Sequence, residues 1–439
     1  MKVGTCKSEW GSQLPAEPSM TNSKNPGPPL SHVGISEEVR DFYERYPYPR
    51  PVDDLDSYGR SWNDLQKRKA DFHLFWPGRS YREDFSILVA GCGTSQAAKY
   101  AMRWPHAQVV GIDFSATSLR RTEDLKRKYD LKNLQVHQLA VERAGELARS
   151  FDQIVCTGVL HHLEDPDAGL SALRNVLNPD GAMHLMVYAP YGRTGIYMLQ
   201  EFCRRLGISA TDGAIRDLVT ALGMLPPGHP LETILRAAPD FGDEAELADA
   251  LLHPQDRAYT VPQFFGFLRR AGLTFGRWTR QAPYSLRCGV IANLPQAERI
   301  AQLSPEEIYA AVELFRGTMV RHSAVVYRDE VDLQRIDFSR TGWLDYVPIR
   351  IADTVCVLER LPQGAAAVLI NRAHTFRDLF FPITAMQKRL FDAIDGKLSI
   401  ENIVRATSSP EERPKNVDLA CRFFEQLWWQ DQVVFGASG

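Results

Sequence analysis

The sequence is poor in the features that mark secreted, zinc-stapled or membrane-spanning proteins. Its seven cysteines are an odd number and none forms a Cys-x-x-Cys pair, which argues against a disulfide framework and a zinc knuckle. No segment reaches the roughly 20 consecutive apolar residues that span a bilayer. Residues 1–30 hold several prolines but no apolar signal-peptide core, so we expect a disordered leader over residues 1–35. These absences predict a cytoplasmic protein with no membrane partner.

Surplus charge of either sign is also missing. Lysine and arginine number 51 against 54 aspartates and glutamates, a formal net charge of −3. Nucleic-acid binding needs a concentrated positive surface, so no nucleic-acid partner is expected. The 439 residues are 44% hydrophobic, which is enough for one large core and a second, smaller domain.

The segment 87–95, Ile-Leu-Val-Ala-Gly-Cys-Gly-Thr-Ser, carries the most information. An apolar run enters a turn at Gly91 and Gly93, and a second apolar run ends at Asp113. The glycines allow a sharp turn and leave space for a ligand, and the carboxylate can accept hydrogen bonds from both ribose hydroxyls. This layout predicts a nucleoside-binding β-α-β unit. A dinucleotide motif would need a third glycine where Gln96 stands, which favours a ligand without a pyrophosphate.

These residues resemble the first motif of the class I S-adenosylmethionine-dependent methyltransferases, in which an apolar strand runs into Gly-Cys-Gly-Thr-Gly. Later segments continue the resemblance in order: a fourth strand at 151–156, the loop 158–166, and a helix, turn and fifth strand within 173–188. The resemblance covers about residues 84–192 and extends to about 290. It implies an α/β fold with a doubly wound, seven-stranded Rossmann-like sheet, and S-adenosyl-L-methionine as the cofactor.

The resemblance also implies which residues bind the cofactor. They are Gly91, Cys92, Gly93, Asp113, Phe114, Ala140, Val141 and Gly158. Three positions depart from the family pattern: Val89 replaces an acidic residue, Ser95 replaces the second glycine of Gly-Thr-Gly, and Ala140 replaces the acidic residue near adenine. These departures keep open the alternative of a non-catalytic scaffold that still binds the cofactor.

Hydrophobic periodicity predicts the domain organisation. The core strands are expected at 86–90, 108–113, 134–138, 152–156 and 182–188, with a sixth at 273–280 after a helix at 261–271. The predicted parts are a methyltransferase domain over 36–295 with a helical insertion at about 192–260, a connecting helix and linker over 296–345, and an accessory module over 346–439. The resemblance to the methyltransferases implies that the insertion roofs the substrate.

Three helices followed by a strand make the last part resemble a small winged-helix α+β module. Residues 351–439 hold ten lysines and arginines against eleven aspartates and glutamates, a net charge of −1, so a DNA-reading wing is not expected. We expect this module to serve docking, homodimer formation or substrate presentation, or only to buttress the first domain.

The carboxyl-end rim of the fourth and fifth strands is where open α/β sheets bind ligands. The catalytic candidates there are His161, His162 and Tyr188, because an imidazole can remove a proton near neutral pH. A structural role, in which the His-His pair bonds the backbone, is the competing interpretation. The candidate substrate contacts are Tyr46, Tyr48, Tyr191 and Arg193, and no metal is expected.

The sequence therefore favours a methyltransferase that moves a methyl group to an O, N or S nucleophile of a small molecule. A peptide or protein acceptor is the first alternative. An NAD-dependent dehydrogenase is a second, and the missing third glycine counts against it. The identity of the acceptor lies beyond the sequence.

Overall fold

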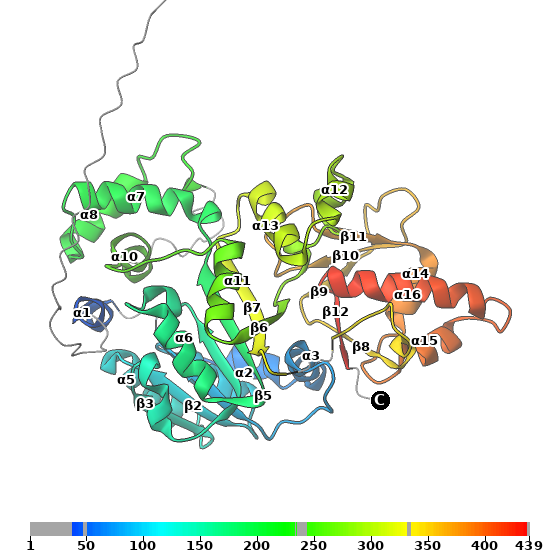
Figure 1. Cartoon of the computed structure of the whole chain (residues 1–439), viewed down its shortest axis with the longest axis horizontal. Coiled ribbons are helices and arrows are strands. Elements are labelled where there is room, and N and C mark those ends of the chain that lie inside the picture. Colours follow the sequence, from blue (N-terminus) through cyan, green and yellow to red (C-terminus); the bar gives the residue numbers. More distant parts are fainter. Residues whose placement is uncertain (1–36, 47–50, 233, 235–243, 332–334, 437–439) are drawn as a thin grey trace, which may run out of the picture. The chain divides into compact units, whose positions relative to one another are not determined.

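The computed structural model describes residues 37–46, 51–232, 234, 244–331 and 335–436. Its main sheet has seven strands in the order β3-β2-β1-β4-β5-β7-β6 (Figure 1). The strands are β1 Ser86–Ala90, β2 Gln108–Asp113, β3 Leu134–Gln138, β4 Phe151–Thr157, β5 Leu177–Tyr188, β6 Leu273–Trp278 and β7 Arg321–Arg328. The predicted α/β class and seven-stranded Rossmann-like sheet are confirmed.

Strands β1 to β5 run parallel, and β7 pairs antiparallel with both β5 and β6. Parallel strands are covered on both faces, which is why they consist of nearly continuous apolar runs such as residues 87–90. The five predicted core strands lie where the pattern placed them. Strand β5 starts earlier than predicted, at Leu177.

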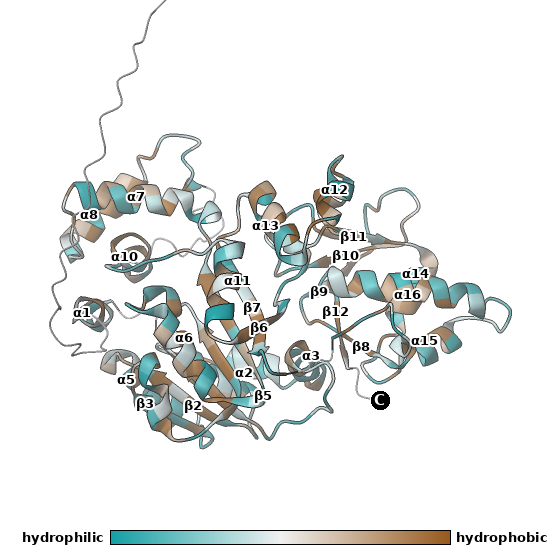
Figure 2. Ribbon diagram, in the orientation of Figure 1, coloured by the Kyte–Doolittle hydropathy of each residue, from teal (hydrophilic) through white to brown (hydrophobic). Residues whose placement is uncertain are grey.

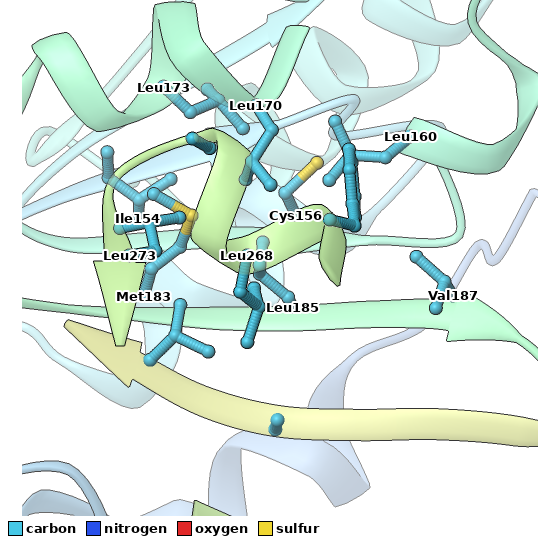
Figure 3. Packing of buried hydrophobic residues seen from close by; sticks show 14 of the residues in the cluster. Ile154, Cys156, Leu160, Leu170, Leu173, Met183, Leu185, Val187, Leu268 and Leu273 are labelled. Atoms are coloured by element: carbon cyan, nitrogen blue, oxygen red, sulfur yellow. The ribbon is translucent and has the colours of Figure 1, made fainter. Parts of the chain in front are cut away.

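Alternating residues of each strand enter two separate hydrophobic cores. Leu88 belongs to the core on one face, whereas Ile87 and Val89 belong to the core on the other. Helices α6 (Pro166–Asn175) and α11 (Val261–Arg270) cover the first face, and α2 (Asp56–Trp62), α3 (Leu65–Phe75), α4 (Gln96–Arg103) and α5 (Ala116–Lys128) cover the second. Figure 3 shows Leu170 of α6 and Leu268 of α11 packed over β4 and β5.

The helical insertion predicted after the fifth strand is present. Its helices are α7 (Thr194–Arg205), α8 (Asp212–Leu222) and α10 (Glu244–Leu252), and the N-terminal helix α1 (Glu37–Arg45) packs against them. Phe42 and Tyr46 are buried among Ile196, Ile215 and Leu247. Figure 2 shows that α7 carries both polar and apolar residues, as expected for a helix with one face on a core.

The C-terminal part contains two small antiparallel sheets and three helices. Its elements are β8 Val347–Arg350, β9 Thr354–Val357, β10 Ala367–Asn371, β11 Phe380–Ile383, α14 Ala385–Asp392, α15 Ile400–Thr407, α16 Arg413–Trp429 and β12 Val433–Gly436. Strand β12 pairs with β8, and β9, β10 and β11 form the second sheet. The structure has the predicted order of three helices and a strand, but the three-stranded sheet was not expected. The winged-helix class stays a prediction.

The segment assigned to a connecting helix and linker requires a correction. Helices α12 (Ala297–Ala301) and α13 (Pro305–Arg316) precede β7, which lies between β5 and β6 in the main sheet. The sheet therefore extends to Arg328, past the expected boundary at 295, because the last of its seven strands along the chain inserts between two earlier ones. Among the described residues, no helix has the length and apolar character to cross a bilayer. The expected leader, 1–35, lies outside those residues.

Candidate active site

The glycine turn joins the end of β1 to the end of β2 through one carboxylate. Asp113 accepts hydrogen bonds from the Gly93 amide at 2.8 Å and from the Ser115 amide at 2.9 Å. Both Gly91 and Gly93 have positive φ, at 67° and 54°, a region that side-chain-bearing residues rarely adopt. The carboxylate therefore holds the turn open, a structural role that sequence reasoning did not assign to it.

Burial raises the pKa of Asp113 to about 6, although its backbone hydrogen bonds favour the charged form. Only 8% of the residue is exposed. A carboxylate has about four lone-pair sites, so Asp113 can accept a hydrogen bond from a ribose hydroxyl in addition to those from the backbone. Asp113 thus fits the predicted nucleoside contact.

The other predicted cofactor residues surround this turn or follow the neighbouring strands. A Cβ on Gly91 would lie 2.3 Å from Cγ2 of Val159, so the turn packs directly against the loop after β4. Gly158, at the start of that loop, has φ 80°. Cys92 is fully buried and burial raises its thiol pKa, which makes it a packing residue. Its side chain therefore does not meet a ligand.

The predicted adenine side is formed by short segments after β2 and β3. Phe114 follows Asp113, and its ring lies 5.7 Å from that of Tyr43. Ala140 precedes the 3₁₀ helix Val141–Leu147, in which Val141 is buried. The neighbouring Glu142 is half-buried, and burial raises its pKa.

The His-His loop forms a single 3₁₀ turn, Leu160–His162, after β4. His161 is fully buried, and neither ring nitrogen has a hydrogen-bond partner among the described residues. Its ring lies 3.9 Å from Tyr188 and 4.2 Å from His162. Burial lowers the pKa of His161 well below its usual value. His161 is thus a neutral ring packed between its neighbours.

His162 is oriented by the insertion. Its Nδ1 lies 2.8 Å from the Gln255 carbonyl oxygen, so Nδ1 carries the proton and Nε2 keeps its lone pair. The His253 ring lies 4.0 Å away and is tilted by 37°. Burial lowers the pKa of His162, which keeps it neutral and able to accept a proton at physiological pH. Of the two histidines, His162 has the geometry of a base.

Tyr43 and two residues that sequence reasoning missed, Asp249 and His253, complete this cluster. The Tyr43 hydroxyl donates to Asp249 at 3.0 Å, and the Tyr43 and His253 rings lie 5.4 Å apart. Asp249 and His253 are both buried, on or just after the apolar helix α10. The signal in the sequence that could have identified them is the presence of two polar residues within an otherwise apolar helical segment. Their partner, His162, lies far away in the sequence.

The ligand atoms of His162, Asp249 and His253 all lie within 4.8 Å of one another, close enough for one metal ion. However, Nδ1 of His253 accepts a hydrogen bond from the Gln255 amide at 3.0 Å. The proton of the neutral ring is then on Nε2, where it can donate but cannot ligate a metal. No partner for Nε2 occurs among the described residues. The cluster is better suited to a polar organic ligand.

The remaining predicted residues divide between the rim and the insertion. Arg193 is buried, pairs with Asp256 at 3.0 Å, and holds its guanidinium 3.5 Å from the centre of the Tyr188 ring. Tyr191 is exposed. Tyr46 donates to Asp212 at 3.0 Å inside the insertion core, so it packs there instead of contacting a substrate as predicted. Tyr48 lies outside the described residues.

Comparisons with known proteins agree with this geometry. A protein-family profile described as a methyltransferase domain matches residues 88–183. An uncharacterized protein of Synechococcus is 34% identical over 253 residues, which cover 55% of this chain and 59% of that protein. A trans-aconitate 2-methyltransferase of Deinococcus radiodurans is 31% identical over 142 residues, 31% of this chain and 51% of that protein. The chain thus spans between half and three fifths of the length of these relatives.

The solved structure of PKMT2 from Rickettsia typhi with AdoHcy is similar in fold, with a TM-score of 0.61 and 16% identity. The match covers 85% of this chain and 76% of that one. Residues 88–183 therefore form a methyltransferase domain, and the resemblance of this part of the chain to the class I S-adenosylmethionine-dependent methyltransferases is confirmed.

Proposed function

We propose that the chain is an S-adenosylmethionine-dependent methyltransferase whose acceptor reacts at the cluster of Tyr43, His162 and His253. The observation that carries the proposal is the position of that cluster. It lies beside Phe114 and the loop after β4, the same loop that packs on Gly91. A nucleoside on Asp113 would therefore have a buried, neutral base near it.

S-adenosylmethionine supplies, when bound, a methyl group activated by a positively charged sulfur. Gly91, Gly93 and Asp113 would hold its nucleoside, and Phe114, Ala140 and Val141 would line the adenine. The protein's own task is then alignment, which can contribute up to roughly 7–11 kcal/mol to lowering the barrier. Closure by the insertion excludes water from the reacting atoms.

His162 removes the proton of the acceptor. Its Nε2 lone pair receives that proton while Nδ1–H stays bonded to the Gln255 carbonyl, which stabilises the resulting imidazolium. Asp256 lies nearby and adds negative charge that supports the cationic ring. The Nε2–H of His253 and the Tyr43 hydroxyl orient the acceptor.

A small molecule with an O, N or S nucleophile is the proposed acceptor class. The buried cluster favours it, because a protein surface would have to enter beneath α10 to reach His162. The name of the Deinococcus relative, a trans-aconitate 2-methyltransferase, also supports a small acceptor.

The test combines binding with transfer. Calorimetry should detect S-adenosylhomocysteine but not NADH, and transfer of labelled methyl from S-adenosylmethionine to a metabolite extract should yield a product heavier by one methylene. Label found in protein instead would support the peptide alternative. Binding without any transfer would support the scaffold alternative and refute the catalytic proposal.

A further inference from the structure

A cavity of about 680 Å³ opens beside the proposed reaction site, on the face of the sheet that α3 and α4 cover. Thr157 and Met186, at the ends of β4 and β5, line it. The start of β7 and the C-terminal module contribute other walls, through Arg321, Asp353 and His374. Small-molecule sites commonly occupy about 300–1,000 Å³, so the cavity has the size of a metabolite site.

The cavity carries an excess of positive charge. Its lining has four cations, Lys67, Arg103, Arg280 and Arg321, and two carboxylates, Asp71 and Asp353. Each carboxylate pairs with one arginine: Asp71 with Arg103 at 3.1 Å, and Asp353 with Arg280 at 3.5 Å.

The other two cations are not neutralised in this way. Among the described residues, neither Lys67 nor Arg321 has a carboxylate within salt-bridge distance. His184 adds no charge at neutral pH, since burial lowers its pKa to about 4. A lining with four cations and two carboxylates, in which Lys67 and Arg321 have no ion-pair partner among the described residues, favours an anionic ligand.

An aromatic surface accompanies these cations. The Trp62 ring lies 4.3 Å from Nζ of Lys67 and 3.9 Å from the Arg103 guanidinium, so cations hold it in place. Tyr100 also lines the cavity. A flat apolar group of a ligand can pack on these rings while its anionic groups meet Lys67 and Arg321.

Strands β4 and β5 connect the wall of the cavity to the proposed reaction site. Thr157 accepts a hydrogen bond from Gln96 at 2.8 Å, and Gly158 of the predicted cofactor site follows it directly. Met186 and Tyr188 lie on the same face of β5, since they are two residues apart on a strand. The Tyr188 ring lies 5.7 Å from the His162 ring, which links the cavity to the base.

We propose that this cavity binds the acceptor, a small anionic molecule that carries carboxylate or phosphate groups and a flat apolar part. The inference that the bound molecule is methylated rests on the proposed function. The inference that it is a small anion rests on the cavity alone. Lys67 and Arg321 bind the anionic groups and turn the nucleophile toward His162. The C-terminal module thereby completes the acceptor site instead of only buttressing the sheet.

The test uses calorimetry on the full chain with three named probes: terephthalate, its neutral diamide, and inorganic phosphate. Terephthalate should bind, and the diamide should bind at least tenfold more weakly. Arg321→Glu should weaken terephthalate at least tenfold, and Lys67→Gln should act in the same direction. Arg422→Glu is the matched control, an exposed arginine outside this cavity, and should change the dissociation constant less than twofold.

Arg321 is exposed, so its variant is expected to fold, and a thermal melt checks this. The inference is overturned if neither terephthalate nor phosphate binds, if the diamide binds as tightly as terephthalate, or if Arg321→Glu leaves binding unchanged. Titration with S-adenosylhomocysteine separates the two proposals. A chain that binds terephthalate but not this nucleoside refutes the proposed function, and one that binds only the nucleoside refutes the cavity's role.

Discussion

Replacing Asp113 by alanine should weaken cofactor binding far more than folding. The variant leaves the amides of Gly93 and Ser115 without an acceptor, which costs about 1–3 kcal/mol for each buried donor. It also removes a buried carboxylate whose pKa is raised from 3.8 to about 6, and this shift corresponds to roughly 3 kcal/mol of destabilisation at neutral pH. The two effects largely cancel, so the free energy of unfolding should fall by no more than about 3 kcal/mol.

Cofactor binding has no such compensation. Two charge-assisted hydrogen bonds to the ribose contribute about 1.5–3 kcal/mol each. Their loss should raise the dissociation constant of S-adenosylhomocysteine by at least about 100-fold. Calorimetry measures this constant, and urea unfolding measures stability on the same preparations.

Asp152→Ala is the matched control. Asp152 also accepts a backbone hydrogen bond, from the Ser86 amide at 2.8 Å. However, it lies near the amino end of β4, whereas Asp113 lies at the carboxyl end of β2. Its variant should lose stability and keep cofactor affinity. A dissociation constant that is unchanged in Asp113→Ala, or equally weakened in both variants, would refute the reasoning.

The raised pKa of Asp113 also predicts a pH dependence. Above about pH 6 the group is charged in the folded chain and accepts hydrogen bonds from the ribose. Below that pH it becomes protonated, so affinity for S-adenosylhomocysteine should fall by up to tenfold per pH unit. In Asp113→Asn this component should disappear. Affinity that stays constant between pH 7 and pH 5 contradicts the assignment.

Three further variants test the turn, the base and the module. Gly91→Ala should abolish nucleoside binding, because the new Cβ would lie 2.3 Å from Val159 and φ is 67°. His162→Ala should reduce turnover by about 10²–10⁴-fold with cofactor affinity kept, and raised pH should restore part of the activity. Asp431→Ala should cost about 3–5 kcal/mol in urea unfolding, since this fully buried carboxylate binds the Gln281 and Ala282 amides and joins the module to the sheet.

Each of these variants has a control. Gly145→Ala adds a Cβ that meets nothing within 4 Å, and should bind the nucleoside normally. His161→Ala should lose stability, with any loss of turnover following the unfolded fraction. Asp418→Ala changes an exposed carboxylate of α16 and should leave unfolding within about 0.5 kcal/mol. Parallel losses in a variant and its control would show a general effect on folding.

The glycine turn and the carboxylate of the predicted nucleoside site could be recognised from the sequence alone. Gly91, Gly93 and Asp113 could be assigned because their roles are local: positive φ at a turn, and a carboxylate at the end of a strand. The parallel strands could also be predicted from the sequence, because a strand that is buried on both faces consists of a continuous apolar run. The order of the strands in the sheet could not be predicted, because β7 follows β6 in the chain but lies between β5 and β6 in the sheet.

The residues of the proposed acceptor site became visible only in the folded chain. Asp249 and His253 meet Tyr43 and His162 because α10 folds back over the rim of the sheet, and no local pattern encodes that approach. The same holds for the cavity, whose cations come from α3, α4, β7 and the segment after β6. Sequence spacing reports which residues share a helix or a strand face. It does not report which distant faces meet, since that depends on how all the cores pack together at once.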